Sequence, residues 1–409
     1  MCISEYFNIA KVEICLLKSR FGLLSFGEGV TMKKENVKSL IIILVFALFI
    51  GVVSIGTLIT APQTNYLENE KRYTAEMPPF SVNTLLDTTY LKNAEKYVED
   101  RIFGRSFFVG TNSYMKLLEG GNILEDVYMC SEGYLINAPK PLNEKNVINN
   151  LSRFEEFSKE ANLPSRMIIV PSPGCVMSEI VPDKNALYCD KYIFSKAEEI
   201  LSNIQLTDVR DSLKNAFESG STVYYKTDHH LSSYGCYILY SEFMKEAGLS
   251  PIAKEKFNIE THKNFCGTTR ASSGYFLTKG EDIELWHSAF DLEVSVSNGK
   301  EYEKTQDSFF FREHLENDDK YPVFADGNHA LTKITNKSKS GKNLLVIKDS
   351  YAHCTANFLS CEYENVYMID LRYYRFPVSE FIKENDIDEL LFLYGTDAIN
   401  TDTNSAWLY

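Results

Sequence analysis

Two short segments of the chain hold side chains that could carry out acyl transfer. The segment Tyr224–Gly235 contains Asp228 and His230, and the segment Leu344–Cys354 contains Ser350. A serine hydroxyl is a weak nucleophile at neutral pH unless a base removes its proton, and that base needs a carboxylate to hold its ring in one tautomer. Because the two segments supply all three kinds of group, they predict a site for nucleophilic acyl transfer.

Both segments stand at the expected ends of strands in an α/β fold. Apolar runs that alternate with helical patterns predict a mostly parallel sheet covered on both faces. In such sheets, ligands bind beyond the carboxyl ends of the strands. Ser350 follows the predicted strand Asn343–Lys348, while Asp228 and His230 follow a short strand predicted over Thr222–Tyr225. We therefore expect the three side chains to meet at one rim of the sheet.

The other elements follow the same rhythm, apart from one region. Strands are also predicted over Arg166–Pro171, Asn365–Asp370 and Glu389–Tyr394, helices over Asn93–Phe103, Asn146–Ala161, Phe194–Ile204, Val209–Ser219, Ser233–Ala247, Thr355–Leu359 and Val378–Asn385, and a hairpin over Val127–Ile136. Residues 258–338 are more irregular and predict a β-rich insertion. The α/β domain is thus expected over residues 141–409, preceded by a tether and an N-terminal elaboration over residues 60–140.

Further residues near the two segments are candidates for substrate contacts. The backbone N–H group of Ser350 or Tyr351 is expected to stabilise an oxyanion, because both amides lie where a strand gives way to a helix. A serine at such a junction is also a common helix N-cap. Arg372, Tyr373 and Tyr374 follow another strand end and are expected to line a substrate groove, although a polar, aromatic rim without a catalytic part would have the same pattern.

A membrane helix is predicted near the N-terminus. Residues 39–59 carry no charge, and 21 such residues are enough to cross a hydrocarbon layer of roughly 30 Å. Lys33, Lys34 and Lys38 directly precede this run, so residues 1–38 are expected in the cytoplasm and the C-terminal domain outside a single-pass anchor in the cell membrane. A cleaved signal peptide is the alternative, but its apolar region is usually only about 7–15 residues long. Met32, followed by two lysines, is a hypothetical true start of the protein.

Composition narrows the function further. The formal net charge of −14 argues against an extended surface for nucleic acid, because phosphate backbones attract concentrated positive charge. Seven of the nine cysteines follow the membrane run, and they show neither CxxC nor metal-ligand spacing. We therefore expect buried free thiols, no metal site and no cofactor.

The two segments also carry a resemblance to a known family. Asp228-His229-His230 resembles the motif that names the DHHW protein family, and Leu344–Ser350 resembles its nucleophile block, a variant of the Gly-Asp-Ser motif of SGNH hydrolases. The chain departs from the motif at Leu231, where the family has Trp, and at Lys348, where many relatives have Gly. Weaker matching pieces are Glu70-Lys71-Arg72 through Pro79 and Ser81, Glu132–Leu135, Val170–Met177, Phe265–Gly274 and Gly327–Lys333.

This resemblance implies a fold and a set of roles. It implies a three-layer α/β/α SGNH-like domain related to the alginate O-acetylation proteins. It assigns Ser350 as nucleophile, His230 as general base and Asp228 as orienting carboxylate, with His229 at the variable middle position as a candidate substrate contact. The implied function is a serine O-acetyltransferase or O-acetylesterase acting on cell-envelope polysaccharide. A transferase would also need an acyl donor, which suggests an integral-membrane acyltransferase as partner.

Two other functions remain open at this stage. Asp-His-His is also a metal-ligand triplet in phosphodiesterases, although a two-metal site needs further aspartates at other strand ends. The chain could also be a polysaccharide-binding protein that has kept the fold and lost turnover. The two segments together favour the enzyme.

Overall fold

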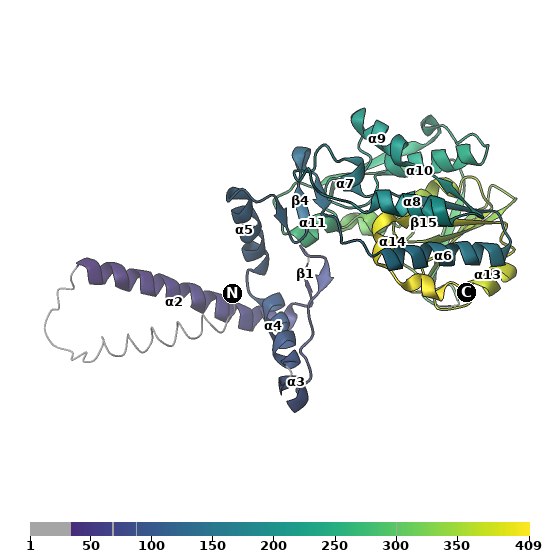
Figure 1. Cartoon of the computed structure of the whole chain (residues 1–409). Coiled ribbons are helices and arrows are strands. Elements are labelled where there is room, and N and C mark those ends of the chain that lie inside the picture. Colours follow the sequence, from purple (N-terminus) through teal and green to yellow (C-terminus); the bar gives the residue numbers. More distant parts are fainter. Residues whose placement is uncertain (1–33, 68, 87, 300) are drawn as a thin grey trace. The chain divides into compact units, whose positions relative to one another are not determined.

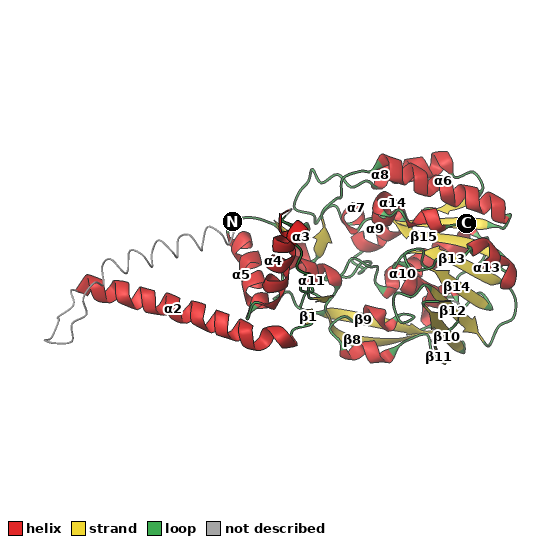
Figure 2. Cartoon of the chain, turned by 90° about the horizontal axis from the view of Figure 1, so that it is seen from below, coloured by secondary structure: helices red, strands yellow, loops and turns green. Residues whose placement is uncertain are grey.

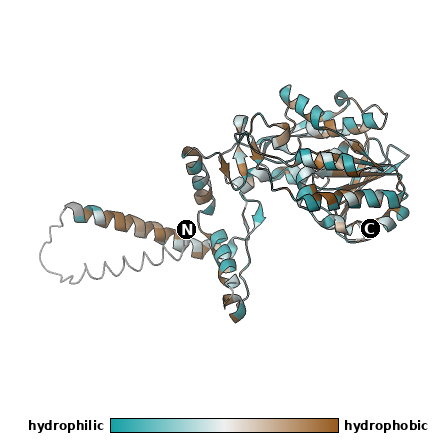
Figure 3. Cartoon of the chain, viewed as in Figure 1, coloured by the Kyte–Doolittle hydropathy of each residue, from teal (hydrophilic) through white to brown (hydrophobic). Residues whose placement is uncertain are grey.

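The computed structural model describes residues 34–67, 69–86, 88–299 and 301–409, which form two compact units. The first unit, described from residue 34 to Pro62, is dominated by α2 (Lys34–Thr60). Residues Asn36–Gln63 are long and apolar enough to cross a membrane, and Figure 3 shows that most of α2 is hydrophobic. A membrane anchor therefore remains supported by length and composition, while its orientation stays a prediction. The hypothesis of a start at Met32 falls outside the described residues.

The second unit, Gln63–Tyr409, is built on an eight-stranded mixed sheet (Figures 1 and 2). The strand order is β11-β10-β12-β14-β13-β15-β6-β7, in which the five strands from β14 to β7 are parallel and the three from β11 to β12 are antiparallel. The strands are β6 (Ser165–Val170), β7 (Ile204–Thr207), β10 (Leu292–Ser297), β11 (Lys304–Gln306), β12 (Leu331–Asn336), β13 (Asn343–Lys348), β14 (Asn365–Ile369) and β15 (Glu389–Gly395). The predicted mostly parallel α/β sheet is confirmed.

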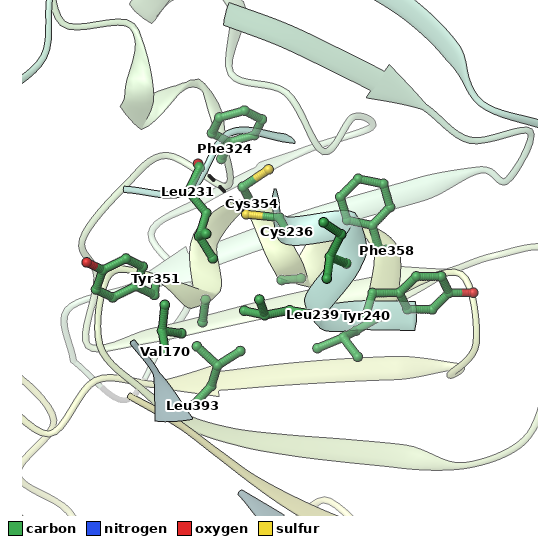
Figure 4. Close-up of a cluster of buried hydrophobic side chains, with 14 of the residues drawn as sticks. Val170, Leu231, Cys236, Leu239, Tyr240, Phe324, Tyr351, Cys354, Phe358 and Leu393 are labelled. Carbon is green, nitrogen blue, oxygen red and sulfur yellow. Dashed lines mark hydrogen bonds between the residues drawn. The ribbon is translucent and has the colours of Figure 1, made fainter. Parts of the chain in front are cut away.

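Helices pack against both faces of this sheet because its central strands are apolar on both sides. One core contains side chains from α6 (Glu144–Ala161), α8 (Asp190–Ile200), α13 (Val378–Glu384) and α14 (Thr396–Thr401). The other contains side chains from α9 (Arg210–Glu218), α10 (Ser233–Glu246) and α12 (Ala352–Leu359). Figure 4 shows Leu239 of α10 and Phe358 of α12 in this second core, with Val170 and Leu393 from the sheet.

The region predicted as an insertion divides its strands between two sheets. Strands β10, β11 and β12 extend the large sheet at its antiparallel edge, whereas β8 (Asn258–Phe265) and β9 (Glu281–His287) form a separate antiparallel pair. Between these strands lie α11 (Thr268–Ser273) and the short helices η4 (Arg312–Glu316) and η5 (Tyr321–Val323). This region reaches the carboxyl end of β13, because the Tyr321 hydroxyl donates to the carbonyl of Ser350.

The N-terminal part of the second unit consists of small elements. They are the hairpin β1 (Tyr66–Leu67) and β2 (Arg72–Tyr73), the helices α3 (Val82–Leu86), α4 (Thr89–Arg101) and α5 (Arg105–Leu118), and a three-stranded sheet of β3 (Ile123–Leu124), β4 (Val127–Met129) and β5 (Leu135–Asn137). The remaining elements are η1 (Ala61–Gln63), η2 (Ser131–Gly133), α7 (Pro173–Val176), η3 (Lys254–Lys256) and η6 (Asn404–Trp407). All seven cysteines in the described part of the chain are free thiols.

Candidate active site

The strand predicted over Thr222–Tyr225 does not exist as a strand of the sheet. Tyr224 forms only an isolated antiparallel bridge with Leu231, and the segment folds back on itself as a tight loop. The N–H of Tyr225 donates to the carbonyl of His230 at 3.1 Å, and the N–H of Ser232 donates to that of Val223 at 2.9 Å. The apolar run is buried, as a strand would be, but it pairs with the residues after it rather than with the sheet.

This loop is held at fixed points on both sides. The hydroxyl of Tyr224, a fully buried side chain, donates to the carbonyl of Pro171 at 2.7 Å, just beyond β6. Ser232 caps α10, because its Oγ accepts from the N–H of Gly235 at 3.1 Å. The loop between these points therefore presents Asp228 and His230 in a defined conformation beside the parallel strands.

Ser350 reaches the same place from the sheet itself. It follows β13, and the N–H of Asp349 still donates to the carbonyl of Leu393 on β15 at 3.1 Å. The Asp349 carboxylate then accepts from the N–H of Tyr351 at 2.9 Å and from that of Gly395 at 2.7 Å. Asp349 thus holds the turn that carries the nucleophile, which is a different role from that of Asp228.

The structure brings together the three predicted catalytic residues, of which His230 and Ser350 lie 120 positions apart in the chain. Ser350 Oγ lies 2.8 Å from His230 Nε2, and His230 Nδ1 lies 2.5 Å from Asp228 Oδ1. The backbone N–H of His230 also donates to Asp228 Oδ1 at 2.9 Å. With Nδ1 donating to the carboxylate, Nε2 is left as the acceptor that faces the serine hydroxyl, which is the tautomer that a general base requires.

The carboxylate of Asp228 is buried and stays charged. Its Oδ2 accepts from the N–H of Thr268 at 2.6 Å and from the Thr268 hydroxyl at 2.9 Å. Burial by itself would raise the pKa of Asp228, but the neighbouring His230 and His229 rings and these hydrogen bonds outweigh burial and hold that pKa well below its usual range. Asp228 can therefore orient His230 and stabilise the imidazolium that forms when the serine loses its proton.

A cavity of about 480 Å³ opens in front of Ser350. His229 and Arg372 line it, as does Lys140 from the loop after β5. His229 Nδ1 lies 3.0 Å from the Thr268 hydroxyl, and the Arg372 guanidinium donates to Asp370 Oδ2 at 2.6 Å. Two of the predicted substrate residues thus face the cavity, and their contact with a substrate stays a prediction.

The two tyrosines beside Arg372 lie elsewhere. Tyr374 is only 5% exposed and packs in the core with α13, so it cannot touch a ligand in the cavity, and its predicted substrate role is corrected. Tyr373 is 48% exposed but does not line the cavity. The side chains of these two consecutive residues lie on different sides of a short turn, Tyr374 in the core and Tyr373 at the surface. The sequence pattern did not indicate which of the two tyrosines would be buried.

The two backbone amides predicted as oxyanion donors differ in whether they already donate a hydrogen bond. The amide of Tyr351 is engaged by Asp349, as described above, and its hydroxyl donates to the carbonyl of His229 at 3.0 Å. Among the hydrogen bonds of the described residues, none uses the N–H of Ser350. Of the two predicted amides, that of Ser350 is therefore the available one.

Three residues of the site were not identified from the sequence. Thr268 holds Asp228, Tyr321 stacks on His230, and Gly267 leaves the space in which Asp228 fits. Thr268 and Gly267 fall within Phe265–Gly274, a piece that resembles the family, so a signal for them existed. Tyr321 lies in the irregular β-rich region, where no local pattern marks it.

Comparison with known proteins agrees with the resemblance. Residues 179–369 match the model of the DHHW protein family. A DHHW family protein from Eubacterium siraeum matches in structure with a TM-score of 0.61 and 19% identity, over 70% of this chain and 95% of that chain. Bacillus cereus PatB1 with a sulfonyl adduct matches with a TM-score of 0.57 and 18% identity, over 69% of this chain and 100% of that chain. The O-acetyltransferase domain of Pseudomonas putida AlgJ matches more loosely, with a TM-score of 0.43 and 12% identity over 68% and 92%. No curated protein shows a significant sequence match to the chain.

Proposed function

We propose that the chain, whose residues 179–369 match the model of the DHHW protein family, is a membrane-anchored serine acyl-transfer enzyme acting on cell-envelope polysaccharide, as an O-acetyltransferase or O-acetylesterase. The observation that carries this proposal is the continuous hydrogen-bond chain from Asp228 through His230 to Ser350. The expected three-layer SGNH-like arrangement, the outward-facing domain and an integral-membrane acyltransferase partner belong to the same proposal. Helices on both faces of the sheet and the apolar helix α2 support it.

The proposed reaction proceeds in two halves. Ser350 Oγ attacks the carbonyl carbon of an acyl ester while His230 Nε2 takes the serine proton, and the alcohol leaves with that proton to give an acyl-enzyme. A sugar hydroxyl or water then attacks the acyl carbon and gives its proton to His230, which passes that proton to Ser350 Oγ as the bond between the acyl group and the serine breaks. The amide of Ser350 is the proposed donor to the oxyanion that forms in each half.

The metal-dependent phosphoesterase is the competing enzyme. Ligand atoms of Asp228, His229 and His230 all lie within 4.8 Å of one another, as a metal site would require. Both ring nitrogens of His230, however, are already engaged, one by Asp228 and the other by Ser350. A metal ion would have to displace one of these partners, so the geometry favours acyl transfer.

A covalent serine probe tests the proposal directly. The full chain should react with a fluorophosphonate reagent, in which Ser350 Oγ bonds to phosphorus and fluoride leaves, and Ser350→Ala should abolish the labelling. Ser172→Ala is the matched control, because Ser172 also lines the cavity but its hydroxyl donates to Asp190 at 2.7 Å. Unlabelled protein should be incubated in parallel with an acetyl ester donor and oligosaccharide acceptors, and mass spectrometry then shows whether acetate reaches sugar or water.

Each alternative has its own outcome. A wild-type chain that does not label but has chelator-sensitive phosphodiesterase activity would support the metal site. A chain that binds polysaccharide with neither activity would support the non-catalytic binding protein.

A further inference from the structure

The hairpin β1–β2, which follows the apolar helix α2 closely in the sequence, buries one lysine in the catalytic domain. Tyr66 pairs with Tyr73 and Leu67 with Arg72, which places Lys71 in the turn. Lys71 has a φ of 50°, in the left-handed region that disfavours lysine, and its side chain is only 9% exposed. A buried ammonium in a strained turn persists only where specific partners hold it.

The residues on either side of Lys71 are paired within the N-terminal part. The Arg72 guanidinium binds both oxygens of Asp100 on α4, at 2.6 and 2.8 Å. Glu70 accepts from Arg105 of α5 at 2.6 Å. These pairs fix the hairpin to α4 and α5. Of the three charged residues Glu70–Arg72, Lys71 is therefore the one whose side chain reaches the loops around the active site.

Lys71 contacts the two loops that pack against Asp228 and His230. Its ammonium donates to the carbonyl of Cys266 and lies 3.4 Å from Asp319 Oδ1. Cys266 directly precedes Gly267 and Thr268, which pack against and hydrogen-bond Asp228.

The second loop leads to His230. Asp319 Oδ1 accepts from the N–H of Tyr321 at 3.3 Å, and the Tyr321 ring stacks on His230. One ammonium therefore ties together the loop behind Asp228 and the loop behind His230.

Electrostatics agrees with these contacts. Burial lowers the pKa of Lys71, while the negative charges of Asp319 and Asp228 oppose that effect. Burial raises the pKa of Asp319, and Lys71 opposes it. Both carboxylates thus favour the charged form of Lys71, and Lys71 favours the charged form of Asp319.

We propose that Lys71 is a positioning residue of the active site. The hairpin formed by β1 and β2 would then hold the loops behind Asp228 and His230 in place, in addition to linking α2 to the rest of the chain. This inference rests on the proposed acyl-transfer function. Lys71 acts through the loops at Cys266 and Asp319, and it touches neither the serine nor the substrate.

Lys71→Met in the full chain tests this role, with Lys96→Met as the control because Lys96 is exposed on α4. The probe is the fluorophosphonate reagent, and its concentration dependence separates the maximal reaction rate from the half-saturating concentration. We expect Lys71→Met to lower the maximal rate at least about tenfold with little change in half-saturation, because positioning rather than binding is lost. Lys71→Arg should restore most of the rate, and Lys96→Met should react like the wild type.

Melting temperatures separate positioning from folding. All assays are run well below the melting temperature of each variant, where a purely structural lysine would leave the maximal rate unchanged. A folded Lys71→Met chain that reacts at the wild-type rate overturns the inference. Should that variant fail to fold, Asp319→Asn, which keeps the side-chain shape but removes the negative charge that faces the ammonium, decides in the same way.

The inference and the proposed function fail differently. A wild-type chain that does not react at Ser350 overturns the proposed function and the inference with it. A wild-type chain that reacts at Ser350, together with unchanged rates for Lys71→Met and Asp319→Asn, overturns the inference alone.

Discussion

The imidazole of His230 lies parallel to the phenol ring of Tyr321, with ring centroids 3.9 Å apart and an angle of 11° between the planes. The Tyr321 hydroxyl donates to the carbonyl of Ser350 at 3.3 Å. One buried side chain therefore contacts both the base and the backbone of the nucleophile. Leu231, which directly follows the base, is 1% exposed in the core, and the aromatic ring that covers the base comes from Tyr321 in a distant loop.

Tyr321→Leu should slow labelling of Ser350 by about tenfold. The imidazolium that forms during attack is attracted to an aromatic face, and such contacts contribute about 0.5–1.5 kcal/mol. Tyr321→Phe keeps the ring and loses only the hydroxyl, so it should slow labelling about twofold. Fluorophosphonate kinetics below the melting temperature of each variant measure both effects, and equal rates for the two variants would show that stacking has no part in catalysis.

Gly267→Ala should lower the rate of Ser350 labelling by about 100-fold, while the folded state loses only about 1–3 kcal/mol of stability. A Cβ at this position would lie 2.2 Å from Asp228 Cβ and 2.6 Å from Asp228 Cα, so the backbone of the catalytic loop would have to move. Overpacking of this kind costs about 1–3 kcal/mol, whereas a misplaced base can cost about 100-fold in rate. Gly299→Ala is the control, since its Cβ would meet nothing within 4 Å. Wild-type labelling of folded Gly267→Ala would contradict the assigned geometry.

The sequence predicted the central strands well because each is a short apolar run between helices. The predicted strand Asn343–Lys348 has the same limits as β13, and Glu389–Tyr394 differs from β15 by one residue. The run Thr222–Tyr225 was misassigned, since burial alone produces the same pattern in a loop. The meeting of Asp228, His230 and Ser350 could be expected from chemistry, because each type of group needs the others.

The contacts that hold the catalytic residues in place could not be predicted from the sequence. Lys71 reaches Cys266 and Asp319, and Tyr321 reaches His230, across separations of 91 residues or more. No local periodicity says which of many lysines or tyrosines is buried against a distant loop. Such contacts are fixed by the packing of whole elements, and only the fold reveals them.

Lys348→Met should destabilise the protein by about 3 kcal/mol while leaving labelling within about threefold of the wild type. Lys348 is 1% exposed, and its ammonium contacts His353 Nε2 at 2.7 Å and Asp370 Oδ2 at 3.1 Å. Breaking a buried charge pair costs about 3–5 kcal/mol, reduced here because Arg372 still pairs with Asp370. Denaturant unfolding and probe kinetics are measured for Lys348→Met and for the control Lys256→Met, which replaces an exposed lysine. A large loss of labelling in folded Lys348→Met would give the lysine a part in the reaction.

Glu281→Gln should flatten the pH dependence of stability between about pH 4.5 and about pH 7. Glu281 accepts from the N–H groups of Lys226 and Thr227 at 2.7 and 2.6 Å, just before the catalytic loop. Burial outweighs these hydrogen bonds and raises the pKa of Glu281 from 4.5 to about 7.

The sign of the effect follows from proton binding. Between these two pH values the folded chain keeps a proton that the unfolded chain releases, so the free energy of unfolding falls as the pH rises. The expected contribution is about 3 kcal/mol across the window, because the pKa rises from 4.5 to about 7 and one pKa unit corresponds to about 1.4 kcal/mol. Glutamine does not titrate, so the stability of Glu281→Gln should fall less steeply than that of the wild type, whereas Glu156→Gln, an exposed control on α6, should follow the wild-type curve. Urea unfolding at pH 5, 6, 7 and 8 measures the difference, and parallel curves for Glu281→Gln and the wild type would show that Glu281 is ionised throughout.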